Sequence, residues 1–89
     1  MMSEEQFRKQ LRESGYGEGE FKDFKANLDG PLHTHDFSAM LLVVSGEFIL
    51  GHESGATAFG PGESCEVPAG TRHAERTGAG GARVLLGRK

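Results

Sequence analysis

The stretch that decides the fold is GPLHTHDFSAMLLVVSGEFILG, residues 30–51. From its Gly-Pro pair onward, short apolar runs recur about every eight to twelve residues, and glycine-rich turn sequences bound each run. The gaps are of hairpin length and hold no crossover helix, so a parallel sheet is excluded. The pattern predicts an antiparallel β-sandwich or barrel with strands over residues 32–44, 47–51, 56–59, 64–67, 72–76 and 82–86.

The beginning of the chain predicts a helix. Ser3 and Gln6 have the spacing of a capping box, and Phe7 and Leu11 form an apolar pair four residues apart. An amphipathic helix is therefore expected over residues 1–14, with its end at the first glycine that follows.

The length of 89 residues leaves room for one small domain. Residues 18–28 place phenylalanines among charges without a clear period, and we interpret them as a strand that enters the sheet. The expected organisation is a helix in residues 1–15 and a single β-barrel domain in residues 16–89.

Composition and charge exclude several function classes. Lysine and arginine total 10 against 13 aspartates and glutamates, so no basic surface for nucleic acid is expected. The longest apolar run, residues 39–44, is too short to cross a membrane or to form the core of a signal peptide. Cys65 has no second cysteine to pair with, which fits a reducing compartment. We therefore predict a cytoplasmic protein without nucleic-acid or membrane partners.

A barrel of this size has a thin core, and a homodimer is expected to add stability. The strand face opposite His33 and His35 carries Leu42, Val44 and Ile49. They are the candidates for packing on a second sheet or on a dimer partner.

Three of the four histidines occupy positions from which they can converge. His33 and His35 are two residues apart, and such side chains lie on one face of a strand. On an extrapolated strand, the same face carries Phe37, Ala39 and Leu41, an apolar series typical of a barrel interior. A metal ion is one way to satisfy buried imidazoles, and an ordinary histidine pair without an ion is the alternative.

Around these histidines the sequence resembles the two motifs of the cupin superfamily. The first motif, in family form, is a glycine, five residues, H-x-H, three or four residues, a glutamate, six residues and a glycine. This chain keeps both histidines and the closing Gly46. The second motif is a glycine, five residues, P-x-G, two residues, a histidine, three residues and an asparagine; here it runs from Gly62 through His73 to Thr77, which replaces the asparagine. The resemblance covers about residues 30–77 and implies a cupin-like double-stranded β-helix (jelly-roll) barrel.

The resemblance also implies a metal site formed by His33, His35 and His73. Ala39 stands where the family has its glutamate ligand, so the usual ligand set is incomplete. Glu75 shares the alternation of His73 and is the candidate for an additional carboxylate ligand. We expect one divalent transition metal ion of unassigned identity, Fe, Zn, Ni, Cu or Mn. A barrel that binds metal weakly, or not at all, is the alternative.

Side chains that face the same interior are expected to line a cavity beside the site. Cys65 is one of them, and we interpret it as a small buried hydrophobe, with a soft metal ligand or a redox-sensitive thiol as the alternative. The expected lining residues are Phe37, Ala39, Leu41, Cys65 and Thr77.

Two functions follow from the resemblance. One is a metal-dependent enzyme, dioxygenase-like or isomerase-like, acting on a small organic molecule. The sequence shows no convincing general base, since Tyr16, the only tyrosine, lies outside the motifs. The other is a non-catalytic module that binds or senses a small ligand or a metal, and a barrel that serves only as a dimerisation scaffold is a third interpretation.

Overall fold

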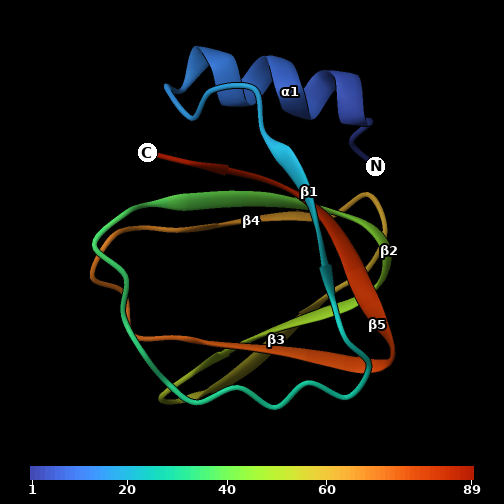
Figure 1. Ribbon diagram of the computed structural model, residues 1–89, viewed down its shortest axis with the longest axis vertical. Coiled ribbons are helices and arrows are strands. Elements are labelled where there is room, and N and C mark those ends of the chain that lie inside the picture. Colours follow the sequence, from blue (N-terminus) through green and yellow to red (C-terminus); the bar gives the residue numbers. More distant parts are fainter.

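The computed structural model describes residues 1–89 and contains one helix and five strands (Figure 1). In chain order these are α1 (Glu4–Glu13), β1 (Glu20–Phe24), β2 (Ala39–His52), β3 (Gly55–Phe59), β4 (Ser64–Val67) and β5 (Ala74–Arg88). The predicted all-β class with a short N-terminal helix is confirmed. The one helix is neither long nor apolar enough to span a membrane.

The strands form one antiparallel sheet that folds back on itself. Strands β1, β5, β2 and β3 are neighbours in that order, and β4 pairs with the beginning of β2. The two long strands belong to both layers. Residues 39–43 of β2 pair with residues 84–88 of β5 in the layer that also holds β1 and β4, whereas residues 48–51 and 74–77 pair in the layer that holds β3. This arrangement is a jelly-roll barrel.

Both long strands change layer at glycines, at the right of the barrel in Figure 1. Gly46 has a φ of 80°, and a Cβ at this position would overlap the carbonyl oxygen of Gly81, whose φ is 69°. The pairing register shifts on either side of Gly46, as at a β-bulge. The predicted turns at residues 45–46 and 78–81 are therefore bends inside β2 and β5, because the two strands stay paired as they turn the corner.

A hydrophobic cluster fills the barrel interior. The bend leaves Val44 and Glu47 unpaired on either side of Ser45 and Gly46, and the inward positions of β2 change from odd numbers before it to even numbers after it. The buried members of the cluster are Leu41, Val43, Phe48, Ala82 and Val84.

Helix α1 lies outside the barrel, above the layer that contains β4 (Figure 1). Its capping box is present: the Ser3 hydroxyl accepts from the Gln6 N–H at 3.1 Å, and the Gln6 side chain accepts from the Ser3 N–H at 2.9 Å. Phe7 and Leu11 are completely buried against the sheet. The helix is confirmed, and its bounds are narrower than the predicted residues 1–14.

The helix also covers the face predicted to meet a second sheet or a dimer partner. Leu42 is 2% exposed and belongs to the cluster under α1, and Val44 packs against the same cluster. The choice of these two residues for an interface is therefore wrong, because the chain's own helix covers that face of the thin barrel. The homodimer stays a prediction without them.

Burial keeps two acidic groups neutral, and the stability of the fold therefore depends on pH in the alkaline range. Burial raises the pKa of the Cys65 thiol from 9.0 to about 11. Burial, and then the neighbouring Glu66 carboxylate, raise the pKa of Tyr16 from 10.0 to about 12. Both pKa values are higher in the folded than in the unfolded chain. This contribution to stability is therefore complete below the unfolded pKa values and is lost as pH rises through the folded ones.

We expect the melting temperature to fall as the pH is raised from 9 to 12. This interval runs from the ordinary pKa of Cys65, 9.0, to the raised pKa of Tyr16, about 12. A Cys65→Ala variant should show a shallower fall between pH 9 and 11, whatever its stability at neutral pH. Thermal unfolding followed by circular dichroism at each pH measures both slopes. Equal slopes for the variant and the wild type would show that the thiol is not the titrating group.

Candidate metal centre

The segment that carries the H-x-H sequence lies at the edge of the barrel. The strand predicted over residues 32–44 begins only at Ala39. The chain pairs with the beginning of β5 at His33 but joins β4 and the end of β5 from Ala39 onward. Residues 34–38 therefore have to cross from one layer to the other, which is why they do not continue the strand.

Backbone hydrogen bonds hold this segment against the residues around the start of β5. His33 and His73 form an isolated bridge in which the His33 N–H donates to His73 O at 2.8 Å and the His73 N–H donates to His33 O at 2.9 Å. The Gly70 N–H donates to His35 O at 2.9 Å. The main chain thus holds the H-x-H segment beside the residues around His73.

Two of the imidazole rings are oriented by carbonyl oxygens. Nδ1 of His33 lies 2.7 Å from Pro31 O, and Nδ1 of His73 lies 2.8 Å from Thr71 O. A carbonyl accepts only, so each Nδ1 carries a proton, and a ring without a second proton presents the lone pair of Nε2. His35 is placed differently, stacked on the Phe37 ring with centroids 4.6 Å apart.

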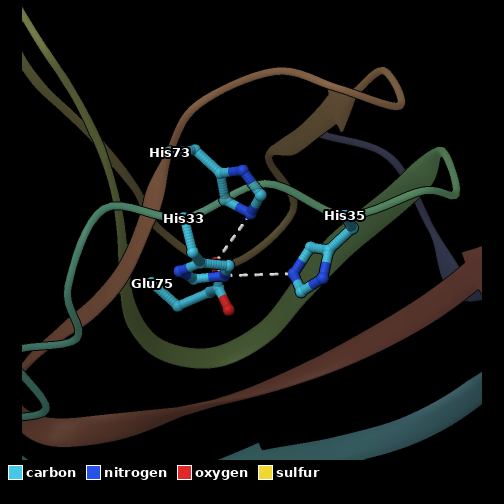
Figure 2. A group of neighbouring side chains, drawn as sticks. All are labelled: His33, His35, His73 and Glu75. Atoms are coloured by element: carbon cyan, nitrogen blue, oxygen red, sulfur yellow. Dashed lines mark hydrogen bonds and ion pairs between the residues drawn. The ribbon is translucent and has the colours of Figure 1, made fainter.

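Four ligand atoms converge at one point (Figure 2). His33, His35, His73 and Glu75 each offer one atom, and these atoms all lie within 4.8 Å of one another. His33 Nε2 is 3.1 Å from His35 Nε2 and 3.1 Å from Glu75 Oε2, and His73 Nε2 is 2.7 Å from the same oxygen. Ligands about 2.1 Å from one ion lie about 3 to 4.2 Å from one another, so the cluster needs only small adjustments to surround an ion.

The Glu75 carboxylate shows that the cluster fits a cation. Its Oε2 atom is buried and lies within 3.1 Å of two imidazole nitrogens. Its neighbours are Nε2 atoms of His33 and His73, which present lone pairs when Nδ1 carries the proton. A buried acceptor surrounded by acceptors is unfavourable unless a positive charge lies among them, either a metal ion or a proton that converts one ring to imidazolium. The donor set of three nitrogens and one oxygen is one that transition metal ions take.

A cavity of about 140 Å³ adjoins the cluster between the two layers. Its lining includes His35, His73 and Glu75, together with three of the residues expected there, Phe37, Ala39 and Leu41. Aromatic and aliphatic side chains make up most of the remaining wall, among them Phe24, Phe48, Leu50 and Leu86.

Two residues expected in the lining lie elsewhere. Cys65 pairs with Leu41 and packs against the interior cluster, so it faces inward without lining the cavity. The Thr77 hydroxyl accepts from the Leu28 N–H at 2.9 Å and donates to Lys25 O at 2.5 Å. It fixes the chain that leads to the H-x-H segment.

Two cationic residues of the lining, Lys22 and Arg88, were not predicted from the sequence. A signal for both was present in the alternation of their strands. Lys22 is two residues from Phe24, and Arg88 is two residues from Leu86, and both of these apolar residues pack on the interior cluster. The uneven pattern of residues 18–28 concealed the inward face of β1.

The chain belongs to the cupin family, whose cupin domain matches residues 21–86. This match includes both motifs and every residue of the cluster. The predicted jelly-roll barrel is therefore shown by the family as well as by the topology. No curated protein matches the chain.

Solved structures share this fold. An RmlC-like cupin from Shewanella frigidimarina is 25% identical, with a TM-score of 0.63 over 76% of this chain and 61% of that one. A protein from Neisseria meningitidis is 23% identical, with a TM-score of 0.62 over 78% and 70%. The polyketide cyclase RemF from Streptomyces resistomycificus is 25% identical, with a TM-score of 0.61 over 76% and 51%. The chain therefore spans between about half and 70% of the length of these proteins.

Proposed function

We propose that this cupin binds one divalent transition metal ion and acts as a metal-dependent enzyme on a small organic molecule. The ligands are Nε2 of His33, His35 and His73 and Oε2 of Glu75. The observation that carries the proposal is the convergence of these four atoms at the wall of a cavity lined mostly by apolar side chains. Such an ion, when bound, polarises an oxygen of its ligand or supplies redox chemistry, depending on the metal.

Glu75 replaces the glutamate that the family motif has at the position of Ala39. It lies on β5 two residues after His73, so the same strand positions the buried histidine and the negative charge. The carboxylate offsets part of the charge of a divalent ion and strengthens its binding. An ion held by these four side chains would keep positions free for a small ligand if it were six-coordinate.

The relationship to RemF supports an enzyme without defining its reaction. That protein is a polyketide cyclase on a barrel of the same fold. A shared fold carries many chemistries, so the substrate of this chain follows from its own cavity.

A second candidate function is non-catalytic binding of a small ligand or a metal. It is favoured by the small number of groups in the cavity that can move a proton. Apart from the histidines and Glu75, the only ionisable side chains in the lining are Lys22 and Arg88. Tyr16 lies under the helix, where its hydroxyl donates to Glu66.

Incubation of the metal-loaded protein with small organic acids and thiols, with and without O₂, separates the two functions. Products are followed by NMR and mass spectrometry, beside the same protein carrying His73→Ala. If the protein is an enzyme, we expect a product that forms only with the wild type and only when metal is present. Ligands that bind without any conversion across the panel would favour the binding module.

A further inference from the structure

The cavity has a positive side that faces the histidine cluster. The cluster comes from the edge segment and the beginning of β5, whereas Lys22 on β1 and Arg88 at the end of β5 belong to the other layer. Both share the inward alternation of their strands and line the cavity, and both residues are exposed to solvent. The chain as a whole has a net charge of −3, so two cations at this one apolar cavity run against its overall charge.

Arg88 has hydrogen-bond donors available for a ligand. Its one ion pair is with Glu20 at 3.4 Å, and the Glu20 side chain is 73% exposed. An exposed pair of this kind contributes little, so it does not hold the guanidinium away from an anion. The guanidinium carbon lies 5.5 Å from the centre of the Phe37 ring, which places it at the cavity wall. Lys22 Nζ lies 5.0 Å from the centre of the Phe24 ring, another part of that wall.

The size of the cavity limits the uncharged part of the ligand. A cavity of about 150 Å³ lined by leucine, isoleucine and phenylalanine holds one benzene molecule in another protein. The cavity here is about 140 Å³. An apolar body of about six non-hydrogen atoms therefore fits, and Lys22 and Arg88 are the cationic side chains of the lining that a polar group can meet.

We propose that the cavity takes a small organic carboxylate. Its apolar body lies among Phe24, Phe37, Leu41, Phe48 and Leu86, its carboxylate faces Arg88 and Lys22, and its far end points to the histidine cluster. Arginine suits this task because its planar guanidinium meets a carboxylate with two parallel hydrogen bonds. The inference rests on the proposed function only for what happens at that far end, since the carboxylate is recognised by residues outside the cluster.

Benzoate and benzamide are a matched pair of probes, because they have the same size and differ in charge. Their dissociation constants are measured by NMR titration of the ¹⁵N-labelled chain, with and without one equivalent of metal. We expect benzoate to bind at least about tenfold more tightly than benzamide, as a charge-assisted hydrogen bond does compared with a neutral one. The largest shifts should fall on the amides of cavity residues such as Ala39, Leu41 and Leu86.

Arg88→Met and Lys22→Met are expected to remove most of the preference for benzoate. Arg83→Met is the matched control, because Arg83 lies on the same strand but points outward, to Asp23 and the Phe21 ring. The proposal is overturned if benzoate and benzamide bind alike, or if Arg88→Met keeps the preference while its melting curve shows a folded protein. It is also overturned if Arg83→Met has the same effect as Arg88→Met.

The same titrations separate this inference from the metal centre. A preference for benzoate that depends on Arg88 in protein that never takes up metal would support the carboxylate site and reject the metal-dependent function. Stoichiometric metal binding, together with a benzoate affinity that does not depend on Arg88, would support the metal centre and reject the carboxylate site.

Discussion

Replacing His73 by alanine is expected to weaken metal binding at least about 100-fold. His73 is 4% exposed, its Nδ1 is held by Thr71 O, and its Nε2 lies 2.7 Å from Glu75. Loss of a residue that merely orients a ligand costs about 10 to 100-fold in affinity, and loss of the ligand itself costs no less. Competition with a chelator of known affinity measures the change.

The effect should also appear as a loss of stabilisation by metal. At a free metal concentration 100 times the dissociation constant, binding stabilises the folded wild type by about 2.7 kcal/mol. His73→Ala should show almost none of this increase at the same metal concentration. Thermal unfolding with and without metal gives the comparison.

His52→Ala is the control for this experiment. His52 lies at the end of β2 and contacts Thr57 and Ser54, so it has the same chemistry as His73 but no place in the cluster. If His73→Ala does not fold, His35→Ala replaces it, because the His35 ring is outside the buried core. Equal metal affinity in the His52 and cluster variants would reject the site.

Glu75→Gln is expected to weaken metal binding by about 10 to 100-fold. The change keeps the size of the side chain and removes its charge, so the loss reports the ion's attraction to the carboxylate. Glu18→Gln is the matched control, since Glu18 is exposed and paired with Arg12 beside the helix. Isothermal titration calorimetry with the same metal gives the affinity of each variant.

A second substitution tests whether Glu75 replaces the missing motif glutamate. Ala39 lines the cavity at the position where the family carries that residue. Ala39→Glu added to Glu75→Gln should therefore recover part of the lost affinity. Unchanged affinity in Glu75→Gln alone would show that Glu75 is not a ligand and that three histidines form the whole site.

The helix and the barrel class were predictable because their signals are local. The Ser3 and Gln6 capping box fixes where the helix starts, and the Phe7 and Leu11 pair identifies its buried side. The alternation that related Glu75 to His73 also holds, since both lie within a short regular stretch around the start of β5.

The shape of the barrel was harder to predict because it depends on pairing between distant residues. The residues next to Gly46 in the sequence are typical of a turn. In the structure Gly46 lies against Gly81, and the two long strands stay paired through the bend that these glycines form. The H-x-H segment reads locally as part of a strand, but His33 pairs with His73 before the chain crosses to the other layer. Neither partner is evident from the spacing of apolar residues alone.

The outer face shows the same limitation. The sequence places Leu42 and Val44 on the side away from the histidines but does not say what covers them. The occupant is helix α1, which reaches them because the residues after Gly15 return the chain to the sheet. The cations of the cavity were missed for a related reason, since alternation places Lys22 and Phe24 on one face of β1 but does not say that the pairing with β5 turns this face inward.

X-ray absorption at the metal K-edge reports directly which atoms surround an ion in this barrel. The protein is purified without a tag or chelators and loaded with one equivalent of metal. We expect an ion surrounded by nitrogen and oxygen atoms at about 2.0 to 2.2 Å, with the multiple scattering of three imidazole rings and no sulfur. An ion with a sulfur neighbour, an ion with fewer than three imidazoles, or protein that retains no metal would contradict this expectation.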